Sequence, residues 1–210
     1  MTQQPLPLIN DLLENHGTTT IPGFTYIPQF LSYDEAADYL RWINTRPTDE
    51  WKTDLSRRVI HYGWQYDYQS RQISSDLYLG PLPGIFSKLA MRLFSETGMF
   101  LEVPNQVIVN EYEPGQGIAM HTDHPEFGPT VAMVSLGDSW SMDFLHERTG
   151  DKQSKLLEVG SALVLGDEAR LEWRHGISKR KSEPGGRKRD TRVSLTFRTV
   201  HAKETDASRR

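Results

Sequence analysis

Residues 192–198 read RVSLTFR, a run in which polar and apolar side chains alternate without a break. Successive side chains of an extended strand point to opposite faces, so the polar residues share one face and the apolar residues share the other. The polar face carries Arg192, Ser194, Thr196 and Arg198. One interpretation is an amphipathic strand whose polar face meets solvent. The other places both guanidinium groups inside a β-barrel, where their fixed set of donors would bind the carboxylates of a small diacid.

The sequence between Glu102 and this strand consists of short β-branched or aromatic runs separated by Gly, Pro and Asp. Runs of this kind predict strands. Their close spacing favours a compact barrel or jelly roll over alternating strands and helices. The expected strands cover residues 105–112, 118–122, 130–136, 140–145, 155–158, 161–165, 170–175 and 190–200.

The N-terminal part of the chain predicts a short strand and two helices. Residues 24–27 are the strand candidate. Ser32 is a plausible N-cap with Glu35 at the third helical position, ahead of apolar residues at helical spacing. A second helix is expected over residues 83–97, with Gly98 as its stop. The predicted fold class is therefore α+β, a β core buttressed by N-terminal helices.

A length of 210 residues suits one domain. Residues 1–20 mix Pro, Gln, Asn and Thr and suggest a flexible N-terminal arm, with a short helical turn near Leu12. We therefore expect an arm over residues 1–20, a single domain over 21–200 and a frayed tail over 201–210. We expect a monomer.

The chain has no cysteine, which excludes disulfides, a thiol nucleophile and cysteine-ligated metal sites. Neither a long apolar run nor a secretory signal is present, so we expect a cytoplasmic protein without membrane contact. The net charge is −4. Between Lys179 and Arg192, however, seven basic residues face only two acidic ones, which marks a strongly basic segment.

A candidate metal site combines His121-Thr122-Asp123 with the distant His175. In a strand, side chains two positions apart share a face, so an H-x-D sequence offers an imidazole and a carboxylate to one point. A second imidazole would complete the two-histidine, one-carboxylate set of non-haem Fe(II) oxygenases. The plainer alternative is a chance H-x-D together with hydrogen-bonded core histidines. His124 lies on the opposite face from Asp123 and could face a substrate.

A third strand offers neutral hydrogen-bond donors. In residues 108–112, Asn110 and Tyr112 point the same way, and an amide and a phenol are suitable donors around a carboxylate.

In order and spacing, Asn110-x-Tyr112, His121-x-Asp123, His175 and Arg192-x5-Arg198 resemble the AlkB family of Fe(II)- and 2-oxoglutarate-dependent dioxygenases. The resemblance implies a double-stranded β-helix (jelly roll) with a nucleotide-recognition lid, and O2 as the oxidant. By this resemblance Fe(II) would be bound by His121, Asp123 and His175, and 2-oxoglutarate by Asn110, Tyr112, Arg192, Ser194 and Arg198. Ser194 stands where the bacterial prototype has an Asn.

Within the family, the stretches NEYEPGQGI, SLGDSWSMDF and HYGWQYDY resemble most the AlkB domain of the animal homologue that hydroxylates a wobble uridine in tRNA. After Asp123 the chain reads His124-Pro125-Glu126, whereas the DNA-repairing prototype has acidic residues at the latter two positions. Pro125 cannot replace the acidic residue that helps to read a damaged base, whereas Glu126 partly can.

An aromatic segment, residues 61–68, lies where the family carries its nucleotide lid, just after Arg57 and Arg58. Alternation would place Tyr62, Trp64, Tyr66 and Tyr68 on one face as a stacking surface for a flipped or single-stranded base. The alternative is a strand that buries its aromatic residues in the core. The basic loop 179–189 would contact phosphates, or be an ordinary solvated loop.

The leading expectation is oxidative demethylation of alkylated bases such as 1-methyladenine or 3-methylcytosine in DNA or RNA. The alternative is hydroxylation of a wobble uridine in tRNA. Two further alternatives are a binding module without turnover and a dioxygenase for protein or lipid.

Overall fold

The computed structural model describes residues 21–53, 55–66 and 75–201. The expected arm over residues 1–20, Tyr68 and all but the first residue of the expected tail lie outside the described residues.

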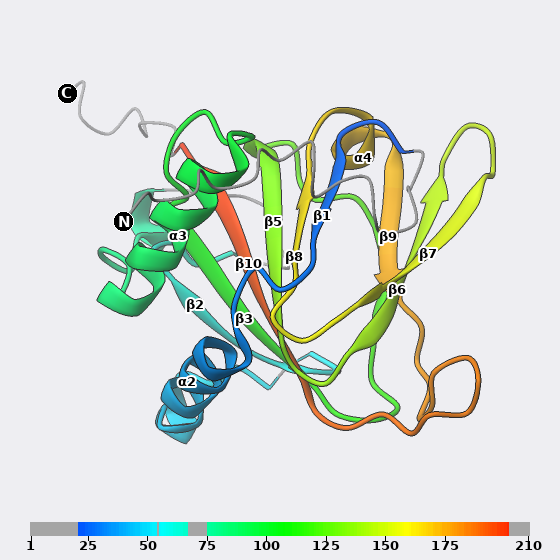
Figure 1. The fold of residues 1–210 in the computed structure, drawn as a ribbon. Coiled ribbons are helices and arrows are strands. Elements are labelled where there is room, and N and C mark those ends of the chain that lie inside the picture. The colour runs from blue at the N-terminus through cyan, green and yellow to red at the C-terminus, as the bar shows by residue number, and fades with distance from the viewer. Residues whose placement is uncertain (1–20, 54, 67–74, 202–210) are drawn as a thin grey trace, which may run out of the picture.

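Two antiparallel sheets form the core of the molecule (Figure 1). The larger sheet has the order β1-β8-β5-β10-β3-β2, and the smaller has the order β4-β9-β6-β7. This two-sheet arrangement is the predicted jelly roll, so the expected fold class is confirmed. The strands are β1 (Phe24–Ile27), β2 (Arg58–Tyr62), β3 (Gln106–Tyr112), β4 (Ile118–His121), β5 (Phe127–Gly137), β6 (Trp140–His146), β7 (Lys152–Leu157), β8 (Ala162–Leu165), β9 (Trp173–Ile177) and β10 (Arg192–Val200).

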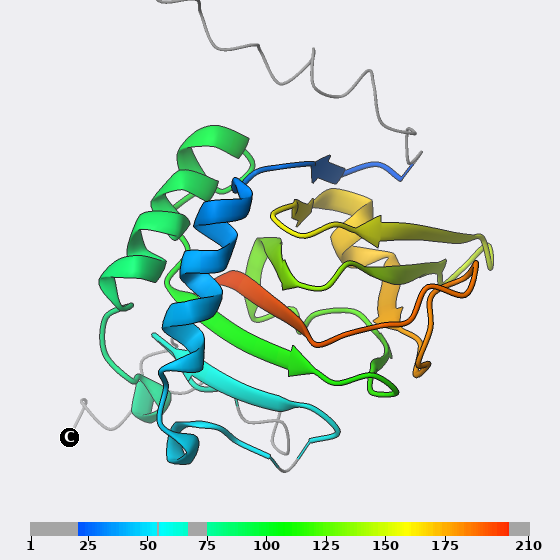
Figure 2. The same cartoon turned by 60° about the horizontal axis from the view of Figure 1, so that its bottom comes forward.

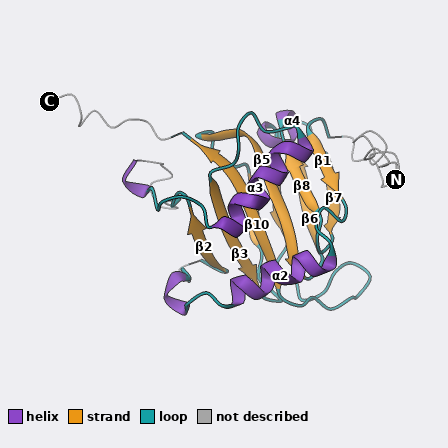
Figure 3. Ribbon diagram, turned by 60° about the vertical axis from the view of Figure 1, so that its left-hand side comes forward, coloured by secondary structure: helices purple, strands orange, loops and turns teal. Residues whose placement is uncertain are grey.

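Two helices, α2 (Tyr33–Asn44) and α3 (Gly84–Thr97), cover the outer face of the larger sheet (Figures 2 and 3). Both were predicted. Ser32 and Glu35 form a capping box, in which the Glu35 amide donates to Ser32 Oγ at 3.2 Å and the Ser32 amide donates to Glu35 Oε2 at 2.8 Å. Gly98 ends α3 with a φ of 62°, in the left-handed region that favours glycine.

The shorter elements include one correction. The sequence predicted a strand over residues 170–175, but residues Asp167–Leu171 form the helix α4 and β9 starts only at Trp173. Five residues are too few for helical periodicity to show in the sequence. Strand β7 also begins earlier than the expected 155–158, because polar residues from Lys152 onward pair with β6. Two 3₁₀ turns, Thr48–Glu50 and Ser75–Leu77, complete the elements, and no helix among the described residues is long and apolar enough to cross a bilayer.

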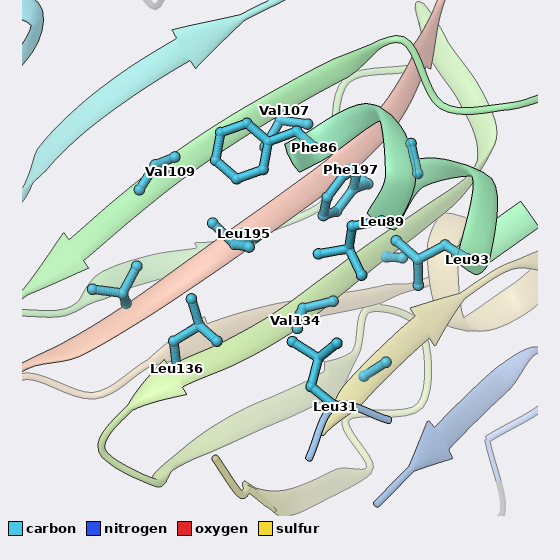
Figure 4. Close-up of a cluster of buried hydrophobic side chains, with 14 of the residues drawn as sticks. Leu31, Phe86, Leu89, Leu93, Val107, Val109, Val134, Leu136, Leu195 and Phe197 are labelled. Carbon is cyan, nitrogen blue, oxygen red and sulfur yellow. The ribbon is translucent and has the colours of Figure 1, made fainter. Parts of the chain in front are cut away.

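The apolar face of β10 packs beneath α3 (Figure 4). Leu195 and Phe197 are fully buried there against Phe86 and Leu89. Each such side chain contributes about 1.5–3 kcal/mol by leaving water. This packing fixes which face of β10 meets the helices, so the polar face of β10 points between the two sheets.

The pairing of β3 with β10 brings the predicted polar residues together. Arg192 lies opposite Tyr112 and Ser194 opposite Asn110 in the antiparallel register. Directly opposed residues project from the same face of a sheet. Their side chains therefore gather on the inner face of the larger sheet.

Candidate active site

A cavity of about 690 Å³ opens between the two sheets. The larger sheet contributes side chains from β3 and β10, and the smaller contributes side chains from β4 and β9. The predicted metal ligands and cosubstrate residues all line this cavity: Asn110, Tyr112, His121, Asp123, His175, Arg192, Ser194 and Arg198. Segments that lie up to 88 positions apart in the sequence thus meet at one place.

His121 and His175 lie opposite each other in the pairing of β4 with β9, and their ring centroids are 4.6 Å apart. His175 Nε2 lies 3.6 Å from Asp123 Oδ2. His121 Nδ1 lies 2.8 Å from the carbonyl oxygen of Ala119, a hydrogen bond that requires the proton on Nδ1. This bond leaves Nε2 of His121 as the nitrogen with a free lone pair, as a metal ligand needs.

The protonation states of these three groups suit a metal ion. Burial lowers the pKa of His175 to about 3 and also lowers the pKa of His121, so both imidazoles are neutral near neutral pH. Burial raises the pKa of the Asp123 carboxyl, but Arg198 and the other neighbouring groups, Arg170 among them, together outweigh burial and hold that pKa below its usual range. The site therefore presents two neutral imidazoles and one carboxylate.

Asp123 is paired with the Arg198 guanidinium through Oδ1, whereas its Oδ2 is buried without a hydrogen-bond partner. Across the part of the chain that the structure describes, no three histidine or acidic side chains enclose a single metal position. The donor set itself fits Fe(II), because two imidazoles and a carboxylate are the ligands of non-haem iron oxygenases. The buried, unpaired carboxylate oxygen supports that fit, since buried polar atoms normally have a partner.

Arg192 gives the clearest indication of an anion-binding site. Its side chain is fully buried. Only Nη2 is bonded, to Ser135 Oγ at 3.0 Å, while Nε and Nη1 have no hydrogen-bond partner among the described residues. Burial lowers the pKa of Arg192 to about 10, so the group is still charged at neutral pH. The carboxylates of 2-oxoglutarate would supply acceptors for these nitrogens, because guanidinium groups form charge-assisted hydrogen bonds with carboxylates.

The two arginines that were expected to meet a substrate separate in the structure. Arg57 lines the cavity and donates from Nε to Asn110 Oδ1 at 2.8 Å. It therefore lies beside the expected cosubstrate residues. Arg58 instead pairs with Glu111 at 2.5 Å and lies over the Trp51 ring at 4.1 Å. Arg58 does not line the cavity, since neighbouring residues at the start of β2 point to opposite faces.

The expected stacking face of the aromatic segment does not form. Tyr62 packs against Phe86 of α3, with ring centroids 5.2 Å apart. Strand β2 ends there, and Gly63 turns the chain with a φ of 79°. A Cβ at Gly63 would lie 1.9 Å from the carbonyl oxygen of Asn105, so only glycine fits. Trp64 packs against Tyr78 with the two rings tilted by 48°, and of the described aromatic residues in the segment only Tyr66 lines the cavity.

His124 lines the cavity as expected of a substrate contact. Glu126 does not, and its carboxylate lies 4.0 Å from His124 Nδ1.

Several cations of the basic loop form ion pairs with acidic residues of the chain. Arg189 is buried and pairs with Glu183 at 2.6 Å, and Arg187 pairs with Asp138 at 2.7 Å. Such pairs make these two arginines weaker candidates for binding phosphate, and the contact of the loop 179–189 with nucleic acid stays a prediction. Lys179 lines the cavity and Lys188 is exposed.

Sequence reasoning missed two cationic contacts at this site. Arg170 donates to the carbonyl oxygens of Asp123 and His124, both at 2.8 Å. Arg174 lines the cavity and donates to the carbonyl oxygen of Met120 at 2.6 Å. No sequence signal marks these two residues, because main-chain partners carry no side-chain signature. Lys179 was noticed only as part of the basic loop.

Comparison with known proteins shows the family of the chain. The model of the 2OG-Fe(II) oxygenase superfamily matches residues 23–198. The alpha-ketoglutarate-dependent dioxygenase AlkB of Escherichia coli is 30% identical, over 69% of this chain and 70% of that protein. The chain belongs to the AlkB family. It is therefore an oxidoreductase that requires Fe(II), 2-oxoglutarate and O2.

Other relatives differ in length and in the activity that their names state. The tRNA (carboxymethyluridine(34)-5-O)-methyltransferase alkbh8 of Xenopus tropicalis is 32% identical over 89% of this chain, which spans only 33% of that protein. The solved structure of OsALKBH1 matches with a TM-score of 0.67 at 24% identity, covering 87% of this chain and all of that one. This likeness supports the fold.

Proposed function

We propose that residues 21–200 form one domain that oxidises a modified base of a nucleic acid. His121, Asp123 and His175 bind Fe(II), and Arg192 and Arg198 bind 2-oxoglutarate together with Asn110, Tyr112 and Ser194. The observation that carries the proposal is the buried Arg192, with two unpaired nitrogens, in the same cavity as the two neutral histidines and Asp123. A buried cation without an anionic partner is costly, and a dicarboxylate cosubstrate would supply a compensating negative charge.

Each residue has a separate task in this scheme. When bound, Fe(II) and 2-oxoglutarate would supply, together with O2, the oxidant for a C–H bond. One oxygen atom of O2 would enter the hydroxyl group of the product and the other would enter succinate, which leaves with CO2. Arg192, which lines the cavity, binds and orients one carboxylate of the cosubstrate. The Ala119 carbonyl holds His121 in the tautomer that leaves Nε2 available. Tyr66 and His124 form part of the cavity wall, where they can contact a base.

The charges around the cavity favour an anionic polymer over a neutral substrate. Arg57 lines the cavity in addition to the two arginines assigned to the cosubstrate. Arg174 and Lys179 also line it, with Glu147 as the acidic neighbour of Arg174, 3.7 Å away. Cations in this position would bind the phosphates of a strand while one base enters the cavity.

Two reactions fit the same residues. Hydroxylation of an N-methyl group gives a product that collapses to formaldehyde and the unmodified base, whereas hydroxylation at a carbon-linked group gives a stable alcohol. Sequence alone favoured demethylation. The comparisons favour a tRNA uridine as the substrate, because the relatives named for carboxymethyluridine in tRNA are 32–33% identical over 85–89% of this chain. Relatives named for alkylated DNA repair and for RNA/DNA demethylation are 28–30% identical over 85–86% of it. We therefore propose hydroxylation of a modified tRNA uridine first and demethylation second.

The test is mass spectrometry of nucleosides after incubation with the protein, Fe(II), ascorbate and 2-oxoglutarate. The substrates are total tRNA and matched DNA and RNA oligonucleotides that carry 1-methyladenine or 3-methylcytosine. We expect one added oxygen on a modified uridine of tRNA, with equal succinate release, and loss of both in His175→Ala. Loss of methyl groups with formaldehyde release would favour demethylation instead. If no nucleic acid stimulated succinate release above the substrate-free rate, the proposed substrate class would be wrong.

A further inference from the structure

Arg170 joins the two segments that carry the expected iron ligands. It lies in α4, three residues before β9 begins and five before His175 (Figure 1). Its side chain is 3% exposed. Nη1 donates to the carbonyl oxygen of Asp123 and Nη2 to that of His124, each at 2.8 Å. One guanidinium therefore connects the start of the His175 strand to the turn that follows His121.

The ladder between β4 and β9 needs such a connection. Its register shifts between Ile118 and His121, so regular pairing is interrupted just before the ligand. Strand β4 then ends at His121, and Asp123 lies beyond it in a segment without strand pairing. Here main-chain carbonyls are bonded to arginine side chains. Because bulges and strand ends near active sites re-aim side chains, their geometry has to be fixed by other contacts.

A guanidinium that donates to two carbonyl oxygens fixes the backbone more firmly than a single hydrogen bond would. The carbonyl of Asp123 sets the orientation of the peptide plane after Asp123, and the carbonyl of His124 sets the next plane. Two charge-assisted bonds from one rigid fork therefore restrain the backbone on both sides of His124. The direction of the Asp123 carboxylate depends on this backbone. Arg174 adds a third bond in the same segment, to the carbonyl of Met120 at 2.6 Å.

Core packing alone does not explain why a charged side chain is buried at position 170. Nε of Arg170 is buried without a hydrogen-bond partner, so the side chain carries a desolvation cost that two bonds only partly offset. An apolar side chain of similar volume is often equally stable in such a position. A buried charge that holds the backbone of a ligand is therefore better explained by the site than by stability.

We infer that Arg170 is a positioning residue, which holds the Asp123 turn so that Asp123 can join His121 and His175 around the metal ion. The inference rests on the proposed ligand set but is independent of the substrate. Arg174, which is partly exposed and bonds one carbonyl, has the same effect to a lesser extent.

The test measures metal binding without turnover. Mn(II) affinity is measured by electron paramagnetic resonance, and the visible spectrum of bound Co(II) reports the ligand geometry. Arg170→Met and Arg170→Lys are compared with Arg92→Met. Arg92 is a fair control because it too donates to a main-chain carbonyl, that of Phe30, but lies on α3 away from the cavity. Thermal unfolding of each variant is recorded in parallel.

We expect Arg170→Met to weaken Mn(II) binding by roughly 10- to 100-fold, as is usual when a partner of a metal ligand is lost. The Co(II) spectrum should change as well. Arg170→Lys should recover part of the affinity, since one ammonium can bond a carbonyl without the fork. Arg92→Met should lower the melting temperature and leave Mn(II) affinity unchanged.

Wild-type Mn(II) affinity and an unchanged Co(II) spectrum in Arg170→Met would overturn the inference, whatever its melting temperature. If Arg170→Met does not fold, Arg170→Lys decides in the same way. A wild-type protein that binds Mn(II) but oxidises no nucleic acid would disprove the proposed substrate and leave the role of Arg170 intact. A wild-type protein that binds no Mn(II) would disprove both.

Discussion

Both faces of β10 carry buried side chains, but these side chains differ in whether the chain provides all of their partners. Leu195 and Arg192 are each 0% exposed. Leu195 meets apolar side chains of the helical layer, so nothing is missing around it. Arg192 has one bonded nitrogen and two without a partner. The apolar face of the strand thus belongs to a well-packed core, whereas the polar face presents hydrogen-bond donors that a ligand can bind.

A buried arginine of the basic loop, Arg189, can be compared directly with Arg192. Arg189 is as deeply placed as the cavity arginines, but Glu183 and the carbonyl of Ser178 bind its guanidinium. Its charge is used within the chain. Nη2 of Arg189 is also buried without a hydrogen-bond partner, so the difference from Arg192 is the carboxylate of Glu183 that neutralises Arg189.

Removing an expected metal ligand should give the largest loss of activity. In His175→Ala, succinate release should fall by roughly a thousand-fold or more, because several kcal/mol of charge stabilisation are lost with the ion. The melting temperature of the metal-free protein should stay near that of the wild type. Retained turnover at equal Fe(II) would show that His175 is an ordinary core histidine.

Replacing Arg192 should separate binding from stability. In Arg192→Met the KM for 2-oxoglutarate should rise by roughly 100-fold or more, since a buried carboxylate that loses its charged partner costs about 3–5 kcal/mol. The free energy of unfolding without cosubstrate should be equal or higher, because a buried cation with two unpaired nitrogens is removed. Steady-state kinetics and urea unfolding measure the two effects. An unchanged KM would place the cosubstrate elsewhere.

The opposite pattern is expected on the apolar face. Leu195→Ala should lower the free energy of unfolding by about 2–5 kcal/mol through a cavity beneath α3. The KM for 2-oxoglutarate of the folded protein should stay within about two-fold of the wild type, a shift below ~0.4 kcal/mol. Urea unfolding and kinetics well below the melting temperature make the comparison with Arg192→Met direct. A large rise in KM would mean that the two faces of β10 are coupled.

The sequence could predict the faces of β10 because alternation is a local property. The two main helices were predicted for the same reason, since their caps and apolar stripes are local. The shared face of Tyr62 and Trp64 was wrong, because the turn at Gly63 depends on the distant carbonyl of Asn105. Alternation cannot show where a strand stops.

The partners of buried cations were equally invisible in the sequence. The charge of the loop could be read directly, but not that Asp138 lies beside Arg187, 49 positions away. Arg170 was placed in a strand, and its two main-chain acceptors lie 46 and 47 positions earlier. Contacts of this kind follow from the arrangement of the sheets rather than from any local pattern.

The exposed lysines of the basic loop should give the smallest effect, and they test the contrast between paired and unpaired cations. Lys179, Lys181 and Lys188 are exposed, whereas Arg187 and Arg189 are bound to acidic residues. If phosphates meet the free cations, changing all three lysines to Gln should make the slope of log Kd against log salt shallower by roughly 2 units on a single strand, at about 0.7 per phosphate contact. Turnover of a saturating short substrate should change little. The matched control changes Lys88, Lys152 and Lys155, which do not line the cavity, and should leave the slope unaltered. Equal slopes in both triple variants would mean that the loop does not contact the nucleic acid, and Arg57 and Arg174 would then be the remaining cations at the cavity for a strand to meet.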